Sequence, residues 1–187
     1  MTHKKGIMVL YTGCSGVGKG TIMKELLKRD PSIRLSVSNT TREPRENEID
    51  GVHYNFITRE EFLAVADDDG YIEHAEYCKN LYGTPRKQVE DMLGEGYNVF
   101  LEIEVKGGLQ VMEKYPDILS IFILPPSLEE LERRLRGRGT EDESVIAERM
   151  KEAVEELKYK DRYRYQVVND DLQTAVNEVL DILHRYQ

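Results

Sequence analysis

Apolar and polar positions follow one another along this chain in blocks that predict strands separated by helices. Continuous apolar runs are typical of parallel strands buried on both faces, and they occupy residues 7–11, 97–103 and 119–124. Residues with helical spacing of their apolar positions come after these runs, at 21–27, 107–114 and 127–136. Strands that alternate with helices predict an α/β fold: a doubly wound parallel sheet with right-handed crossovers and ligands at the carboxyl ends of its strands.

A different pattern separates the first of these strands from the second. Residues 39–51 are polar and charged, which predicts an exposed loop, and residues 81–85 predict a turn. Short strands and helices are expected around them, at 34–38, 53–57 and 71–77 for the strands and at 58–66 and 87–93 for the helices. We therefore expect a small mixed α+β lobe inserted into the α/β core.

The last part of the chain adds helices and one further strand. A break at 137–140 separates a helix capped by Ser127 from a long amphipathic helix at 142–159. A brief strand at 166–168 and a helix at 172–186 follow. No repeat or Pro/Ser-rich linker divides the chain, so we expect its 187 residues to form one domain.

The clearest chemical motif joins the first predicted strand to the first predicted helix. Residues 12–21 read Thr-Gly-Cys-Ser-Gly-Val-Gly-Lys-Gly-Thr and fit the spacing G-x-x-x-x-G-K. Glycines let backbone N–H groups turn towards an anion, Lys19 adds a point charge, and the N-terminus of the helix favours phosphate. A glycine-rich turn without a ligand is the disfavoured alternative. The expected phosphate-binding residues are Gly13, Cys14, Ser15, Gly16, Val17, Gly18, Lys19, Gly20 and Thr21.

One position of this loop departs from the motif. Ser or Thr normally follows the lysine and supplies a hydroxyl to magnesium, but Gly20 stands there. Thr21, one residue on, can contact a phosphate or a metal-bound water. The sequence therefore leaves the metal ligands open.

The net charge and the cysteine content limit the kinds of ligand and partner that the chain is expected to bind. The net charge of −9 argues against a sequence-independent nucleic-acid binder, which would carry a basic face, so an anionic ligand must be met by local arginines. The two cysteines suggest no disulfide framework or metal site. The apolar run near the start is too short for a signal sequence or a membrane span. We expect a cytoplasmic protein without nucleic-acid or membrane partners.

Further motifs follow the loop. They are Ser36-Val37-Ser38-Asn39-Thr40-Thr41-Arg42-Glu43-Pro44-Arg45, Gly51-Val52-His53-Tyr54-Asn55-Phe56, Glu73, Tyr82-Gly83-Thr84, Leu101-Glu102-Ile103-Glu104, Arg134-Leu135-Arg136-Gly137-Arg138-Gly139-Thr140, Arg149 and Val168-Asn169-Asp170-Asp171-Leu172. With the phosphate loop, they make the chain resemble the guanylate kinase family over nearly its whole length. The resemblance implies a P-loop nucleoside-monophosphate-kinase fold in three parts: a core of about 1–37, 96–125 and 150–187, a GMP-binding lobe of about 38–95 and a helical lid of about 126–149.

The resemblance also implies roles for individual residues. Those implied to hold the GMP phosphate are Arg42, Arg45, Tyr54 and Tyr82, and those implied to read guanine are Ser38, Glu73, Thr84 and Glu104. Those implied to act on the transferring phosphates are Lys19, Arg42, Arg134, Arg138 and Arg149, and Asn169 is implied to lie near adenine. The chain departs from the family pattern at Glu46-Asn47, where Pro-Gly is common, at Glu104, where Asp is frequent, and at Lys106, where Gln is frequent.

The chemistry of guanine supports the role of Glu73. Guanine presents N1–H and an exocyclic amino group as adjacent donors, and one carboxylate can accept from both. Adenine lacks this pair, so it would leave a desolvated carboxylate unpaired. On the residues alone, a solvated strand carboxylate is the alternative for Glu73, and a place in the core is the alternative for Tyr54 and Tyr82. Exposed loop charges are the alternative for Arg42 and Arg45.

The implied function is in-line transfer of the γ-phosphoryl group of ATP to GMP, which gives ADP and GDP, with Mg2+ bridging the β and γ phosphates. The acceptor phosphate is already ionised at neutral pH, so charge neutralisation and alignment must supply the catalysis. Two alternatives stay open: a peptide-binding module of guanylate-kinase-like fold, and a related kinase for a phosphorylated sugar. The oligomeric state is not indicated.

Overall fold

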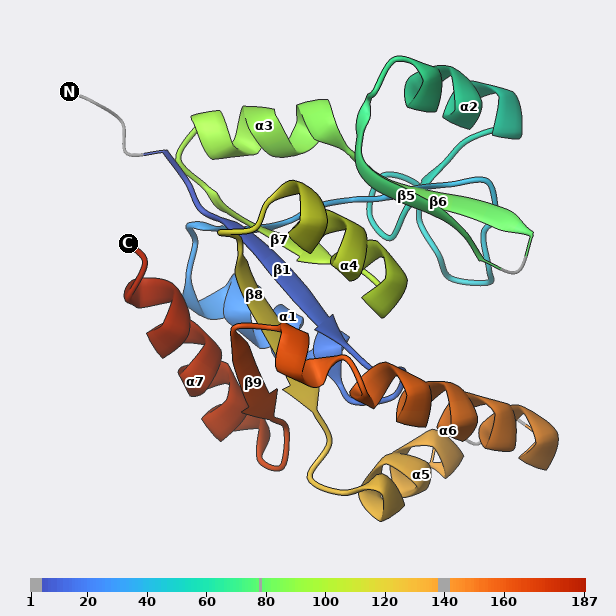
Figure 1. Ribbon diagram of the computed structural model, residues 1–187, viewed down its shortest axis with the longest axis vertical. Helices are drawn as coiled ribbons and strands as arrows, with labels where there is room; N and C mark the ends of the chain where they lie inside the picture. Colours follow the sequence, from blue (N-terminus) through green and yellow to red (C-terminus); the bar gives the residue numbers. More distant parts are fainter. Residues whose placement is uncertain (1–4, 78, 138–141) are drawn as a thin grey trace.

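The computed structural model, which describes residues 5–77, 79–137 and 142–187, has a parallel sheet at its core. Within these residues the sheet has five strands in the order β2-β7-β1-β8-β9, and every neighbouring pair is parallel (Figure 1). The strands are β1 (Met8–Gly13), β2 (Ile33–Leu35), β7 (Asn98–Glu102), β8 (Leu119–Leu124) and β9 (Tyr165–Val168). The predicted α/β core is confirmed.

Helices cover both faces of this sheet, because alternate residues of each strand point to opposite sides. Val9 and Tyr11 of β1 belong to the apolar cluster that packs α1 and α7, whereas Leu10 belongs to the cluster that packs α3 and α4. These helices are α1 (Lys19–Arg29), α3 (Arg86–Gly94), α4 (Val105–Lys114) and α7 (Leu172–His184). The sheet is therefore doubly wound, and burial on both faces explains the continuous apolar runs.

A second, smaller sheet forms the inserted lobe. Its described strands have the order β4-β3-β6-β5; β3 and β4 are parallel and the other pairs are antiparallel. The elements of the lobe are β3 (Asn39–Thr40), β4 (Asn55–Phe56), α2 (Arg59–Asp67), β5 (Tyr71–Tyr77) and β6 (Asn80–Pro85). Phe62 of α2 packs against Tyr71 and Leu81 in a separate apolar cluster. Thr58 and Glu61 form the capping box that starts α2, as the sequence predicts.

Two predictions for this lobe were wrong. Residues 81–85, expected to form a turn, lie in β6, which pairs with β5 on one side and β3 on the other. Glycine is common in turns, but Gly83 allows the backbone of β6 to pack closely against Tyr71, because a Cβ there would lie 2.9 Å from the Tyr71 ring. Asn39 and Thr40, expected in an exposed loop, are buried in β3 because β4 and β6 flank them.

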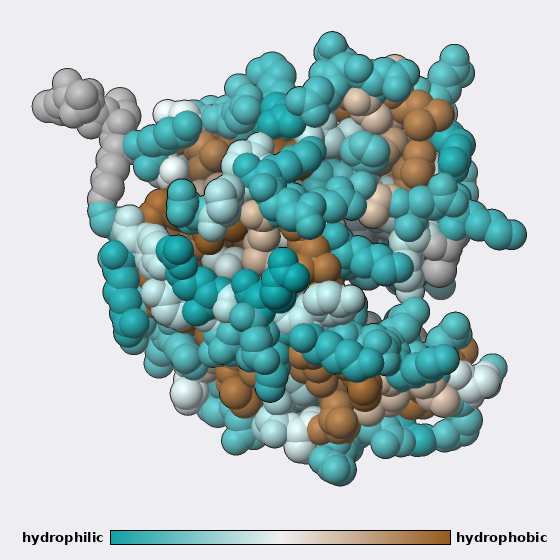
Figure 2. Space-filling view, viewed as in Figure 1, coloured by the Kyte–Doolittle hydropathy of each residue, from teal (hydrophilic) through white to brown (hydrophobic). Residues whose placement is uncertain are grey.

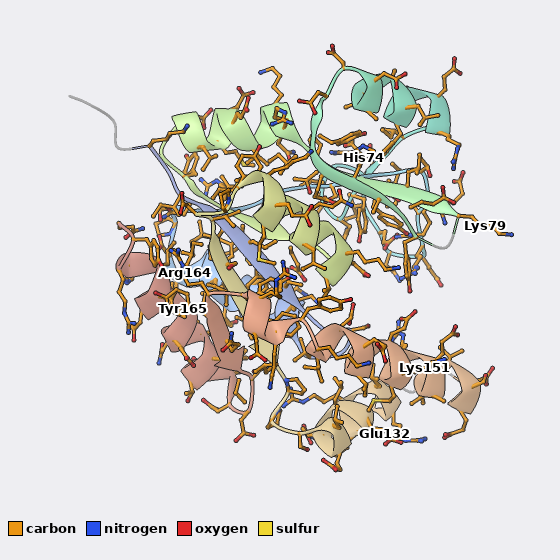
Figure 3. The ribbon with its side chains drawn as sticks, in the orientation of Figure 1. His74, Lys79, Glu132, Lys151, Arg164 and Tyr165 are labelled. Atoms are coloured by element: carbon orange, nitrogen blue, oxygen red, sulfur yellow. The ribbon has the colours of Figure 1, made fainter. Side chains whose placement is uncertain are left out.

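The helices after β8 lie against the phosphate loop. Ser127 caps α5 (Leu128–Arg136) by accepting a hydrogen bond from the Glu130 N–H, and α5 packs against α6 (Glu143–Leu157). A short 3-10 turn, η1 (Lys160–Arg162), then leads into β9. Figure 2 shows a hollow at the right between these helices and the small lobe. None of the helices in the described ranges is long and apolar enough to cross a membrane.

Candidate active site

The phosphate loop closes around its own lysine. Gly16 and Gly18 have φ values of 87° and 100°, in the left-handed region that favours glycine, and Gly18 is the N-cap of α1. The Lys19 ammonium donates hydrogen bonds to the carbonyl groups of Gly13 and, at 3.3 Å, Cys14. The positive charge of Lys19 therefore lies across the loop, close to the N-terminus of α1. The charge and the helix N-terminus both favour the binding of an anion.

Two distant segments support this loop through one carbonyl group. The Asn169 side chain is buried, and its Nδ2 donates to the Val17 carbonyl oxygen at 2.8 Å. Arg134 of α5 donates to the same oxygen at 3.4 Å and to Glu130 Oε1 at 2.8 Å. A Cβ at Gly18 would lie 2.5 Å from Asn169 Nδ2, so glycine is required there for a second reason. Arg134 and Asn169, two of the residues predicted on the ATP side, thus contact the phosphate loop.

The remaining loop residues divide into buried and exposed positions. Cys14 is fully buried, and burial raises the pKa of its thiol to about 11, so the side chain is a neutral packing group. Ser15 is half-buried, whereas Gly20 and Thr21 are exposed. A Cβ at Gly20 would meet nothing within 4 Å. Space for a hydroxyl therefore exists at this position, although the residue lacks one.

Acidic residues lie beside the loop at the carboxyl end of β7. Burial raises the pKa of the Glu102 carboxyl group, and the nearby charge of Lys19 acts in the opposite direction. Tyr11 Oη donates to the Lys19 carbonyl oxygen at 3.2 Å. Glu104 is exposed at the N-cap of α4. In the part of the chain that the structure describes, no group of at least three His, Cys, Asp or Glu side chains could hold a metal ion.

Three of the four predicted GMP-phosphate residues, Arg42, Tyr54 and Tyr82, form an aromatic and cationic group in the lobe. The Arg42 guanidinium donates to Glu48 Oε1 at 2.9 Å and lies 5.6 Å from the Tyr54 ring centre. The Tyr54 and Tyr82 rings meet edge to face, with centroids 5.9 Å apart. Arg45 is exposed, and its backbone N–H donates to Glu48 Oε2 at 2.7 Å. Glu48 therefore positions the loop that carries both arginines.

A buried carboxylate occupies the lobe sheet where a base reader was predicted. Glu73 of β5 is 5% exposed and Thr84 of β6 is fully buried, and Thr84 Oγ1 donates to Glu73 Oε1 at 2.7 Å. Burial raises the pKa of the Glu73 carboxyl group, while the hydroxyl of Thr84 and the charge of Lys114 oppose this. The alternative of a solvated strand carboxylate is therefore wrong. Ser38, directly before β3, is half-buried, and its carbonyl oxygen accepts from the Asn55 N–H at 2.9 Å.

Comparison with known proteins agrees with this geometry. The sequence model of guanylate kinases matches residues 4–186. The chain belongs to the guanylate kinase family. It is 46% identical to a guanylate kinase of Desulfitobacterium hafniense (98% of this chain and 92% of the relative) and 48% identical to one of Synechocystis sp. (97% and 95%). The crystal structure of guanylate kinase from Anaplasma phagocytophilum superposes with a TM-score of 0.80 at 35% identity and covers 100% of this chain and 89% of that one.

The structure also places the departures from the guanylate kinase pattern. Asn47 stands where the family commonly has glycine and adopts a φ of 70°, a conformation that asparagine tolerates better than most residues. Glu104 is exposed and acts electrostatically on Tyr54 of the lobe, so it lies on the side of the core that faces Arg42, Tyr54 and Tyr82, the predicted GMP-phosphate residues. Arg149 is half-buried on α6. Arg138, predicted to act on the transferring phosphates, lies outside the described residues.

Two further features of this guanylate kinase chain escaped sequence reasoning. Glu156, near the end of α6, is directed at the phosphate loop: burial and Glu104 raise the pKa of its carboxyl group to about 7, opposed by Lys19 and the Ser15 N–H. Its Oε2 is buried without a hydrogen-bond partner among the described residues. The second feature is Gly107 of α4, where a Cβ would lie 2.6 Å from Glu73 Oε2. Neither belongs to a local motif, so no sequence signal marks them.

Proposed function

We propose that this chain transfers the γ-phosphoryl group of ATP to GMP, giving ADP and GDP. The observation that carries the proposal is the buried Glu73–Thr84 pair, an acceptor for the donor edge of guanine, in a chain whose phosphate loop retains Lys19. A buried carboxylate of this kind is costly unless a ligand or neighbour pairs with it. Guanine supplies the two adjacent N–H donors that such a carboxylate can accept.

On the ATP side, the backbone of the phosphate loop and the Lys19 ammonium would bind the phosphates. Arg134 already donates to the loop at Val17, and Arg138 and Arg149 would join it on the transferring group. Asn169 holds the same carbonyl oxygen, so we assign it to shaping the loop as well as to the surroundings of adenine. The nucleotide residues on this side are Gly13, Cys14, Ser15, Gly16, Val17, Gly18, Lys19, Gly20, Thr21, Arg134, Arg138 and Asn169.

On the GMP side, Arg42, Arg45, Tyr54 and Tyr82 would bind the phosphate of the acceptor. The position of Arg42 supports this role, because Glu48 holds its guanidinium group beside the rings of Tyr54 and Tyr82. Ser38, Glu73, Thr84 and Glu104 would surround guanine. Closure of the lobe (about 38–95) and of the lid (about 126–149) onto the core would exclude water, which otherwise competes as the phosphoryl acceptor.

The reaction needs no strong general base, because the attacking oxygen belongs to an ionised phosphate. The bond from the γ-phosphorus to the bridging oxygen of ATP breaks as the bond to the GMP phosphate oxygen forms, and the leaving electron pair stays on ADP. Lys19 and the arginines would stabilise the charge that spreads over the transferring group. Catalysis is therefore alignment and charge neutralisation.

Mg2+ fits this site as a companion of ATP. The ion takes one or two carboxylates at most in such sites and keeps phosphate oxygens and water as its other ligands, so a large cluster of protein ligands is not needed. Gly20 offers no hydroxyl, but Thr21 at the end of the loop and the half-buried Glu102 beside Lys19 would orient water on the ion. Mg2+ would supply neutralisation of the β and γ phosphates.

The competing functions differ in their substrates. A peptide-binding module would not need a phosphate loop that retains Lys19, and a sugar-phosphate kinase would have no use for Glu73. We also propose a cytoplasmic location, where both nucleotides occur, and no nucleic-acid or membrane partner, in line with the net charge of −9.

A screen of phosphate acceptors tests the proposal. Purified protein is given ATP and Mg2+ with GMP, AMP or ribose 5-phosphate, and ADP release is followed in a coupled assay. We expect turnover with GMP at least about a hundredfold above that with AMP, because adenine leaves Glu73 unpaired. Turnover with the sugar phosphate alone, or binding of neither nucleotide by calorimetry on folded protein, would refute the proposal.

A further inference from the structure

Helix α4 lies between the core sheet and the lobe. Figure 1 shows it beside β1 on one side and β5 on the other, and its residues contact both strands. Gly107 and Gly108 allow α4 to approach its neighbours closely, because neither residue has a side chain. A Cβ at Gly107 would lie 2.6 Å from Glu73 Oε2 and 3.2 Å from Glu73 Cδ, and a Cβ at Gly108 would lie 2.5 Å from Tyr163 Oη. Gly107 therefore faces the base site, and Gly108 faces the core.

The Glu73 carboxylate cannot easily move away from α4. Its Oε1 accepts the 2.7 Å hydrogen bond from Thr84, and the side chain is 5% exposed. The strand that carries it is also anchored, since Lys114 of α4 donates to the Ile72 carbonyl oxygen at 3.1 Å and Arg86 donates to the Tyr71 carbonyl oxygen at 3.0 Å. A contact of 2.6 Å is shorter than side chains tolerate, so a methyl group at 107 must displace the carboxylate.

We propose that Gly107 is a positioning residue that sets base specificity: the space left by its missing side chain holds Glu73 Oε2 where the amino group of guanine meets it. This inference rests on the proposed function, because it concerns the same carboxylate. Gly107 touches no nucleotide itself and acts through Glu73. The glycine thus belongs to the base site although it lies in a core helix.

The inference distinguishes GMP from IMP, whose base lacks the exocyclic amino group. A carboxylate shifted by about 1 Å loses the geometry of its hydrogen bond to that amino group, so GMP should lose its advantage over IMP. The ATP site should be unaffected, because Gly107 faces β5 and not the phosphate loop. A residue needed only for packing would not change the ratio of two acceptors.

The test compares Gly107→Ala with Gly94→Ala. Both glycines lie within helices, but a Cβ at Gly94, the last residue of α3, meets nothing within 4 Å. For each variant, kcat/KM is measured with GMP and with IMP, together with KM for ATP and the unfolding temperature. We expect the GMP-to-IMP ratio of Gly107→Ala to fall by about 10- to 100-fold with KM for ATP within about twofold, and Gly94→Ala to match the unchanged protein.

A double-mutant cycle sharpens the assignment. In a Glu73→Gln background, adding Gly107→Ala should change the ratio by less than about twofold, because the carboxylate that it displaces is gone. If Gly107→Ala is insoluble, the shorter side chain of Glu73→Asp should restore soluble protein in the double variant. An unchanged ratio in Gly107→Ala, a parallel loss with ATP, or no rescue of an insoluble variant would overturn the inference. The proposed function fails separately, by absence of GMP turnover in the unchanged chain.

Discussion

The phosphate loop and the base site of this chain are built in opposite ways. The loop comes from ten consecutive residues, 12–21, and offers mainly backbone groups around one ammonium. At the proposed base site, Glu73, Thr84 and Gly107 come from two strands of one sheet and a helix of another layer, and the site offers side chains. Side-chain substitutions should therefore damage the base site at many positions and the loop at few.

The two sites also differ in electrostatics. The loop holds a cation against carbonyl groups, a contact that an entering phosphate can replace. The proposed base site holds a buried carboxylate, which Thr84 hydrogen-bonds through its hydroxyl and its backbone N–H. Binding at the loop thus depends on charge, and binding at the lobe depends on whether a ligand satisfies a buried acceptor. The following predictions test this contrast.

Lys19→Ala should cause the largest loss. We expect kcat to fall about a thousandfold with a nearly unchanged unfolding temperature, because the ammonium neutralises transferring charge and packs no core. Steady-state kinetics and calorimetric unfolding measure both. Lys24→Ala, on the exposed side of α1, is the matched control. Normal kcat in Lys19→Ala would remove the lysine from the mechanism.

Glu73→Gln should come next and should affect GMP alone. An amide offers one acceptor where the carboxylate offers two, and its NH2 group opposes the donors of guanine. We expect kcat/KM for GMP to fall about a hundredfold and KM for ATP to stay the same. Glu76→Gln, on the exposed end of the same strand, controls for charge. Equal losses for GMP and AMP would place the base reader elsewhere.

Arg45→Ala should raise KM for GMP about tenfold with little change in kcat, since a charge-assisted hydrogen bond to phosphate is lost. The side chain is exposed, so the fold should be unaffected. Arg59→Ala, an exposed arginine of the same lobe, should have normal kinetics. An effect on ATP in place of GMP would show that Arg45 serves the other ligand.

Asn169→Ala tests the support of the loop. The Val17 carbonyl oxygen would keep only the longer bond from Arg134, so we expect KM for ATP to rise about fivefold and the free energy of unfolding to fall by about 1–2 kcal/mol. Nucleotide titrations and chemical denaturation measure these changes. Asp170→Ala, at the exposed neighbouring position, should change neither. A GMP-specific effect would contradict the assignment to the loop.

The smallest effect concerns the pH dependence of stability through Glu156. Its pKa is raised from 4.5 to about 7 in the folded chain, so the folded state binds the proton more tightly than the unfolded state. Stability should therefore fall as pH rises between these values and level off above them. After allowance for solvent screening we expect about 1 kcal/mol, or about 2–4 °C in unfolding temperature.

Glu156→Gln should remove this slope, and Glu148→Gln, on an exposed turn of α6, should retain it. Unfolding temperatures measured across this pH range distinguish the two. The groups that interact electrostatically with Glu156 include Glu104, Glu152, Lys19, the Ser15 N–H, Cys14 and Tyr163. A slope that survives Glu156→Gln would instead point to Glu73 or Glu102, whose carboxyl pKa values are also raised by burial.

The sequence alone determined the core, the phosphate loop and the order of the motifs. Long apolar strands and a loop of closely spaced glycines carry their structural information locally, through periodicity and backbone freedom. The sequence also predicted that Glu73, Thr84, Arg42, Tyr54 and Tyr82 belong to one lobe, and the structure brings Thr84 to Glu73 and both tyrosines to Arg42. That prediction came from a family pattern, since isolated polar residues have no periodicity.

Only the tertiary structure decided the remainder. Residues 81–85 form a strand, and Asn39 and Thr40 are buried, because neighbouring strands form hydrogen bonds with them and cover them. A local sequence pattern does not reveal these neighbours. Gly107 lies against Glu73 because β5 brings this carboxylate to α4, and the pKa of Glu156 is raised because α6 ends at the phosphate loop. Burial and the pKa shifts that follow from it depend on contacts between distant residues, and these contacts exist only in the folded chain.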